Sequence, residues 1–81
     1  MVYEGIVKWF ASAKQPWGFI KFTDELGADR EVFSHYRNIL ADNQENPRFR
    51  VLVAGQKVQF EVGDGYPASR GTQALNIRVV L

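Results

Sequence analysis

The stretch WGFIKFT at residues 17–23 alternates two kinds of side chain, as a β-strand with one exposed face does. Successive side chains of a strand point to opposite faces of the sheet, so Trp17, Phe19 and Lys21 share one face and Ile20 lies on the other. A charged lysine side chain favours contact with water over burial in a core. We therefore expect the face that carries Lys21 to be exposed, together with its two aromatic rings.

A second aromatic segment, EVFSHY at 31–36, follows the same rule. Phe33 and His35 share one face of this strand, and Val32 lies on the opposite face. If Val32 packs into the core as Ile20 does, Phe33 and His35 extend the exposed aromatic face. Such a surface costs free energy in water unless a ligand or a partner covers it.

The ordinary alternative for these rings is the core, where aromatic residues of a small β domain usually pack. The chain has two Trp, three Tyr and six Phe among 81 residues, which is more than so small a core can hold. Aliphatic residues already supply an interior. We expect this interior to contain Val7, Ile20, Val32, Ile39, Val58, Val62, Leu75, Ile77 and Val79, with Phe22 beside Ile20.

Five segments are rich in β-branched and aromatic residues and are separated by turn-forming residues. No internal repeat, low-complexity linker or heptad pattern interrupts them, and a short helical turn is expected near 37–41. We therefore predict a single all-β domain over residues 1–81. The predicted strands are 2–10, 17–23, 31–36, 56–62 and 72–80.

The composition argues against several classes of protein. There are no cysteines, so neither disulfides nor thiolate metal sites can support the fold, and we expect a cytoplasmic protein. No apolar run approaches the roughly 20 residues that cross a bilayer, and the amino terminus has no basic leader. The formal net charge is only +1, which argues against a ligand held mainly by phosphate neutralisation.

Charge is distributed unevenly along the chain. Lys8, Lys14 and Lys21 are the only charged residues between positions 5 and 23. Acidic residues gather around the next connection, at positions 24, 25, 29 and 31. Lysines without acids beside the aromatic strands favour an anionic ligand.

Five segments of the chain follow one another in this order: GIVKWF, WGFI, VFSHY, AGQKVQFEV and GTQALNI. Together they resemble the cold-shock domain in its bacterial and Y-box forms, from about Gly5 to Val79. The combination is far more specific than any one of its motifs. The resemblance implies a five-stranded antiparallel barrel of the oligonucleotide-binding (OB) fold and a single-stranded nucleic acid as ligand.

The resemblance also implies which residues form the binding surface. One group corresponds to the family's base-stacking residues: Trp9, Trp17, Phe19, Phe33, His35, Tyr36 and, on the loop before the fourth strand, Phe49. Phe10 fits either this group or the core. A second group supplies cations for the nucleic-acid backbone: Lys8, Lys14 and Arg70 by resemblance, and Lys21 by its place beside Phe19.

The chain departs from the family pattern at several positions. Ala11 stands where the family usually has asparagine, and Gln15 and Pro16 stand where its first motif has a glycine. Ser34 replaces a customary valine on the inward side of its strand, so its hydroxyl needs a hydrogen-bond partner. Three connections are longer than in the compact bacterial form: 24–30, 40–48 and 63–71.

Catalytic and metal sites find little support in the sequence. His35 is the only histidine and there is no cysteine, so a transition-metal site would rest on carboxylates alone. Ser34 and His35 are neighbours in a strand and point to opposite faces, so they cannot pair as nucleophile and base. The acidic residues at 24–31 fit no calcium loop. We predict no enzyme, no metal and no cofactor.

The function predicted from the sequence is the binding of single-stranded RNA or DNA by base stacking on an exposed aromatic sheet face. The resemblance implies a modest preference for pyrimidines, and a role as an RNA chaperone or a regulator of transcription or translation. The alternative is a small protein-interaction barrel that uses the same aromatic surface to bind a protein partner. We expect a monomer, although an exposed aromatic face leaves a dimer open.

Overall fold

The computed structural model describes residues 2–11, 17–44, 50–64 and 71–81. It contains one turn of 3-10 helix, η1 (Tyr36–Asn38), directly after the third strand. The strands are β1 (Tyr3–Phe10), β2 (Trp17–Thr23), β3 (Asp29–His35), β4 (Lys57–Asp64) and β5 (Thr72–Val79). The predicted strands are confirmed, and the helical turn begins one residue earlier than expected.

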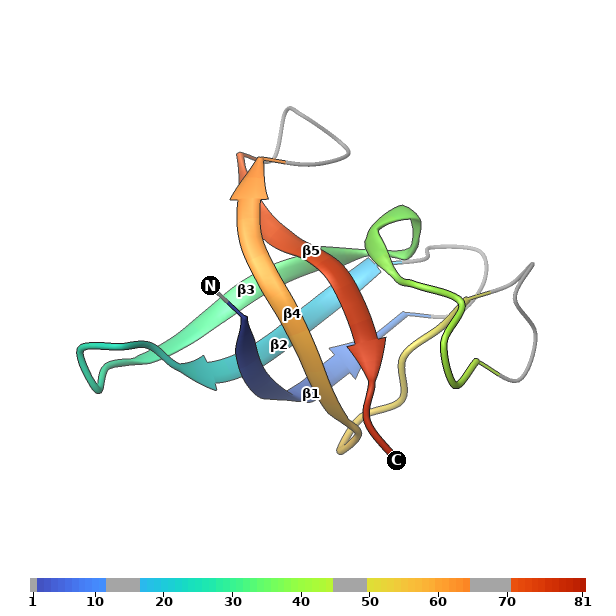
Figure 1. The fold of residues 1–81 in the computed structure, drawn as a ribbon, viewed down its shortest axis with the longest axis horizontal. Coiled ribbons are helices and arrows are strands. Elements are labelled where there is room, and N and C mark those ends of the chain that lie inside the picture. Colours follow the sequence, from blue (N-terminus) through green and yellow to red (C-terminus); the bar gives the residue numbers. More distant parts are fainter. Residues whose placement is uncertain (1, 12–16, 45–49, 65–70) are drawn as a thin grey trace.

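The strands close into a barrel in the order β1-β2-β3-β5-β4 (Figure 1). The β1–β2, β1–β4, β2–β3 and β4–β5 pairs are antiparallel. The β3–β5 pair is parallel, with Phe33 opposite Gln73. The predicted all-β barrel is therefore confirmed, and its expected antiparallel pairing is corrected at the β3–β5 seam. β1, β2 and β3 form one side of the barrel, and β4 and β5 cross over the other side (Figure 1).

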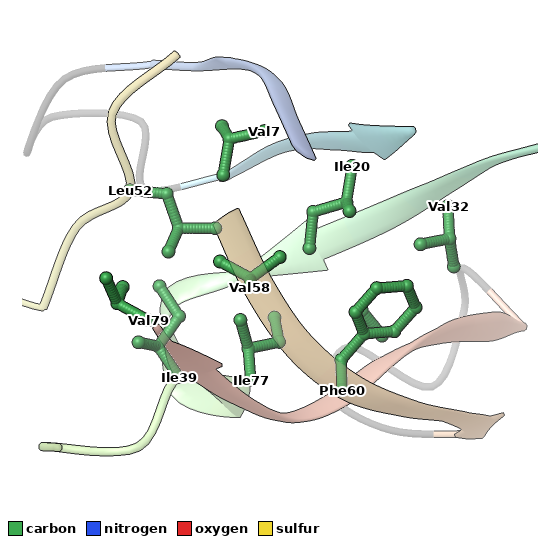
Figure 2. Close-up of a cluster of buried hydrophobic side chains, with 10 residues drawn as sticks. Val7, Ile20, Val32, Ile39, Leu52, Val58, Phe60, Ile77 and Val79 are labelled. Carbon is green, nitrogen blue, oxygen red and sulfur yellow. The ribbon is translucent and has the colours of Figure 1, made fainter. Parts of the chain in front are cut away.

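The core lies between these two sides. Figure 2 shows side chains of β1, β2, β4 and β5 pointing toward one another. The cluster of buried residues contains Val7, Ile20, Val32, Ile39, Leu52, Val58, Phe60, Ala74, Ile77 and Val79. Val62 and Leu75 are only half-buried, which corrects the expectation that both lie inside. Phe22 and Val62 pack against the cluster from its edge.

Phe60 is the large aromatic residue of this core, with an exposed fraction of 1%. Its ring lies 5.2 Å from the ring of Phe22, and the ring of Tyr3 lies 6.0 Å away. These three rings pack against one another, with Phe60 inside the core and Tyr3 and Phe22 at its edge. Phe60, Phe22 and Tyr3 therefore stabilise the barrel, whereas other aromatic residues lie outside this group.

Gly18 lets β1 and β2 approach closely where the barrel curves. A Cβ atom at this position would lie 2.2 Å from the carbonyl oxygen of Trp9 and 2.7 Å from the Cα atom of Phe10. Backbone atoms cannot yield as a side chain can, so a larger residue would force the two strands apart.

No helix in the described part of the chain has the length and hydropathy needed to cross a membrane.

Candidate nucleic-acid interface

A β-bulge in β1 decides which way Trp9 points. Val7 lies opposite Ile20, whereas Trp9 lies opposite Phe19, so two steps along β1 match one step along β2. Lys8 is the extra residue. Such a bulge redirects the side chains that follow it. Val7 is buried at 2% exposure, and Trp9 reaches the outer surface with an exposed fraction of 38%.

Phe10 follows Trp9 and points the other way. It lies opposite Gly18 in the β1–β2 pair. It is half-buried and packs against the core cluster. One side of the Phe10 ring therefore belongs to the edge of the core, and its part in binding stays a prediction.

Five residues of β1, β2 and β3 form one continuous ring cluster on the outside of the barrel, and we call this cluster the aromatic face. Its members are Trp9, Trp17, Phe19, Phe33 and His35. The Trp17 ring is central, because its centroid lies 4.9 Å from that of Trp9 and 5.9 Å from that of Phe33. Phe19 lies 6.2 Å from Trp17, nearly perpendicular to it.

Pairing between β2 and β3 explains this cluster. Trp17 lies opposite His35, and Phe19 lies opposite Phe33. Directly opposed residues of an antiparallel pair project from the same face, so the alternation in each strand places all four rings together. The expectation that these rings share one outer face is confirmed.

The expectation that Phe33 faces water is wrong in one respect. Phe33 projects from the outer face, yet its exposed fraction is only 9%. Its ring packs beside other members of the aromatic face: Trp17 at 5.9 Å, Phe19 at 6.0 Å and His35 at 6.4 Å. The buried Phe33 ring therefore supports the more exposed rings of the aromatic face.

The surroundings of His35 favour the neutral form of its imidazole. Burial lowers the pKa of its imidazole, and the nearby Arg37 guanidinium lowers it further. The Nδ1 atom accepts a hydrogen bond from the backbone N–H of Arg37 at 3.2 Å. An imidazole that accepts at Nδ1 carries its proton at Nε2. His35 therefore presents an uncharged ring at the edge of the aromatic face.

Tyr36 continues the surface beyond β3. Its ring lies 4.9 Å from the ring of His35, and the Arg37 guanidinium lies 5.8 Å from its centroid. Tyr36 is half-buried and also packs against the core cluster. Tyr36 therefore contacts both the core cluster and the ring of His35, a member of the aromatic face.

The cations of the site have a neighbour that sequence reasoning missed. Lys8 Nζ lies 2.9 Å from Glu31 Oε2, and Lys21 lies opposite Glu31 in the β2–β3 pair. The expectation that no acid lies beside the aromatic strands is therefore wrong. The signal was present in the sequence, because Glu31 has the same parity as Phe33 and His35 in β3 and must share their face.

Three of the predicted binding residues, Lys14, Phe49 and Arg70, lie outside the described residues.

Ser34 occupies the inward position expected for it. It is completely buried, and its hydroxyl has no hydrogen-bond partner among the described residues. It lies opposite Gly18, next to the aromatic face but on the core side of the sheet.

No cluster suited to a metal ion is present in the part of the chain that the structure describes: no three residues among its His, Asp and Glu side chains converge.

Comparison with known proteins now identifies the family. The model of the "'Cold-shock' DNA-binding domain" matches residues 3–80. The chain belongs to the cold-shock domain family. Members of this family generally bind nucleic acids.

Curated relatives agree over most of the chain. Cold shock-like protein CspG of Shewanella violacea is 42% identical over 73 residues, which are 90% of this chain and 87% of the relative. Major cold shock protein CspA of Bacillus cereus is 40% identical over 77 residues, 95% of this chain and 96% of the relative.

A solved structure supports the fold. The structure titled "drosophila Unr CSD456" superposes with a TM-score of 0.74 at 20% sequence identity. The match covers 99% of this chain and 31% of that chain, so it shows a shared barrel fold.

Proposed function

We propose that this cold-shock domain protein binds single-stranded RNA or DNA by stacking unpaired bases on the aromatic face. The observation that supports the proposal is the packing of Trp9, Trp17, Phe19 and Phe33 into one outer cluster with centroid separations of 4.9–6.2 Å. Bases present a π face regardless of sequence, and each base stacked on an aromatic side chain contributes roughly 1–3 kcal/mol.

The members of the aromatic face have different roles in this proposal. Trp9 is its most exposed ring and offers a base the most free surface. Trp17 and Phe19 are half-buried and hold their rings at fixed angles to one another. Preorganised rings lose little conformational entropy when a base binds, so more of the stacking energy remains for affinity.

Electrostatic attraction to phosphates contributes less to the binding free energy than base stacking does. The net charge of the chain is +1, and Lys8 is already paired with Glu31. Binding should therefore weaken only modestly as salt rises, with about 2–4 phosphates neutralised. The aromatic face gains most of its affinity from contact with base faces and little from phosphates. It therefore favours single strands, because the base faces of a duplex are stacked inside it.

We further propose a preference for pyrimidines and a role as an RNA chaperone, both suggested by the family resemblance, and action as a monomer in the cytoplasm. A protein that stacks unpaired bases holds RNA in its single-stranded form and melts weak secondary structure without ATP. Transcription or translation of the bound RNA would change as a result.

Titration with short oligothymidine and oligouridine tests the proposal. Trp9 and Trp17 lie on the aromatic face, so stacking of bases should quench tryptophan emission. We expect saturable quenching at micromolar oligonucleotide and much weaker quenching by a duplex of the same length. Unchanged emission would sink the nucleic-acid proposal and favour a protein partner.

A matched pair of variants localises the binding. Phe19→Ala should weaken binding by about 1–3 kcal/mol, because it removes a stacking ring. Val2→Ala removes an exposed hydrophobic side chain that lines a separate hollow with residues of β4 and β5. It should leave the affinity unchanged.

A further inference from the structure

Glu31 lies within the proposed binding surface, not merely near it. It projects from the same face of β3 as Phe33 and His35, two residues before Phe33. Glu31, Phe19 and Phe33 line one open cleft of about 540 Å³. Glu31 and Lys21 also line a neighbouring cleft of similar volume. Glu31 therefore lines both clefts, one of them with rings of the aromatic face and the other with Lys21.

The Glu31 carboxylate forms an ion pair with one described lysine of the site, Lys8, and its residue lies opposite the other, Lys21, in the sheet register. Lys8 Nζ lies 2.9 Å from Glu31 Oε2, an ion pair that spans β2 and joins β1 to β3. Lys21 lies directly opposite Glu31 in the β2–β3 pair. The Lys8 and Glu31 side chains are 44% and 45% exposed, so both are accessible to a ligand.

We propose that Glu31 is a specificity-determining residue that competes with phosphate for Lys8 and so directs the site toward ligands with unpaired bases. This inference rests on the proposed function. A phosphate that approaches Lys8 must displace the carboxylate or share the lysine with it. In the second case it is repelled by a like charge a few ångströms away.

The competition discriminates between ligands because they gain affinity in different ways. A single strand that stacks on Trp9, Trp17 and Phe19 obtains most of its binding free energy from base faces, and it loses little when Lys8 is occupied. A duplex or another polyanion offers phosphates and no free base faces, so its binding depends on available cations. Glu31 thus penalises the duplex more than the single strand.

The test compares Glu31→Gln with Asp42→Asn. Both substitutions raise the net charge by one unit and break one exposed ion pair. Asp42 pairs with Arg78 at 3.0 Å, with side chains 50% and 52% exposed, on the β5 side of the barrel. A general effect of charge would be the same in both variants, whereas competition at Lys8 acts only in the first.

We expect Glu31→Gln to bind oligothymidine about threefold to tenfold more tightly than the wild type, and to gain more than that for a duplex of equal length. The slope of log affinity against log salt should become steeper by about 0.7, the value for one additional phosphate contact to a single strand. Asp42→Asn should change neither quantity beyond a small general increase. Equal shifts in the two variants would overturn the inference.

Lys8→Gln provides the second measurement. In the wild type it should cost less than about twofold in affinity, because no phosphate contact is lost and the exposed Glu31 carboxylate left unpaired is screened by salt. In the Glu31→Gln background the same substitution should cost about threefold to tenfold, since Lys8 there binds phosphate directly. An equal cost in both backgrounds would show that Glu31 does not compete for Lys8.

Failure of this inference is distinguishable from failure of the proposed function. If the wild type quenches on oligothymidine and Glu31→Gln behaves as Asp42→Asn does, stacking stands and only the role of Glu31 is wrong. If the wild type binds neither oligothymidine nor oligouridine, the proposed function fails and the inference fails with it.

Discussion

The rings of Trp9 and Phe19 lie 5.7 Å apart on the outside of the barrel because a single extra residue, Lys8, interrupts the alternation of β1. Without the bulge, Trp9 would share the inward face with Val7. With it, the neighbouring side chains of Lys8 and Trp9 are both exposed. The bulge thus places a cation and a large ring together at the edge of the aromatic face.

The first prediction contrasts a surface ring with a core ring. Trp9→Ala should weaken oligothymidine binding by about 1–3 kcal/mol and leave the free energy of unfolding nearly unchanged. Trp17 remains as the fluorescent probe for the titration. Phe60→Ala should instead destabilise the fold by about 3–5 kcal/mol, because Phe60 is completely enclosed. Urea unfolding measures both, and a loss in Trp9→Ala comparable to that in Phe60→Ala would place Trp9 in the core.

Phe33 gives a different result from Trp9, although both belong to the aromatic face. Phe33 is buried and packs beside Trp17, Phe19 and His35, so Phe33→Ala should lower the free energy of unfolding by about 3 kcal/mol. It should also weaken binding, because Trp17 loses the ring that supports it at 5.9 Å.

Phe33→Leu is the control for this second prediction. It keeps an apolar side chain beneath Trp17, and it should recover most of the stability while restoring only part of the affinity. Urea unfolding and oligothymidine titration of the same samples give both quantities. Full stability in Phe33→Ala would contradict the supporting role assigned to Phe33.

The strands and the ring positions of β2 and β3 could be predicted from the sequence because side-chain alternation is a local property. Trp17, Phe19, Phe33 and His35 follow it without interruption. Alternation also points Phe60 inward beside Val58, as observed. These features need no knowledge of how the strands are arranged.

The bulge at Lys8 and the Lys8–Glu31 ion pair could not be predicted from the residues alone. A bulge depends on how β1 must coil to pair with β2 and with β4, which is a property of the closed barrel. The ion pair joins residues 23 positions apart, and it forms only once the β1–β2 and β2–β3 registers are set. Burial of Phe33 likewise depends on neighbours from another strand.

The third prediction concerns pH. Burial and Arg37 lower the pKa of His35 in the folded protein, so the unfolded chain binds a proton more readily than the folded one. The stability that the neutral ring contributes is fully present above the unfolded pKa of about 6.5. It is lost as the pH falls through that value toward the folded pKa. We therefore expect the melting temperature to decline below about pH 6.5.

His35→Gln should flatten this decline, because glutamine does not titrate and its amide oxygen can still accept a hydrogen bond from Arg37 N–H. The pKa values of Asp24 and Glu25 are lowered by hydrogen bonds to Arg30 and Tyr3, respectively, so their effects on stability fall at more acidic pH. NMR titration of the imidazole provides a direct measurement. A midpoint at or above the value of an exposed histidine would contradict the prediction.

The fourth prediction concerns Ser34, whose buried hydroxyl has no hydrogen-bond partner among the described residues. A buried polar group without a partner costs about 1–3 kcal/mol, and alanine removes that cost while leaving only a small void. Ser34→Ala should therefore raise the free energy of unfolding by about 1 kcal/mol, which corresponds to about 4–8 °C in melting temperature for a domain of this size.

Thr23→Val is the matched control for Ser34→Ala, because it removes an exposed hydroxyl that donates to Asp29 at 3.3 Å. Stability should change by no more than about 0.5 kcal/mol in this variant. Both melting temperatures are measured by circular dichroism. A loss of stability in Ser34→Ala would mean that the hydroxyl is satisfied in solution. A gain would mean that the chain tolerates an unsatisfied hydroxyl directly behind the aromatic face, on the core side of the strand that carries Phe33 and His35.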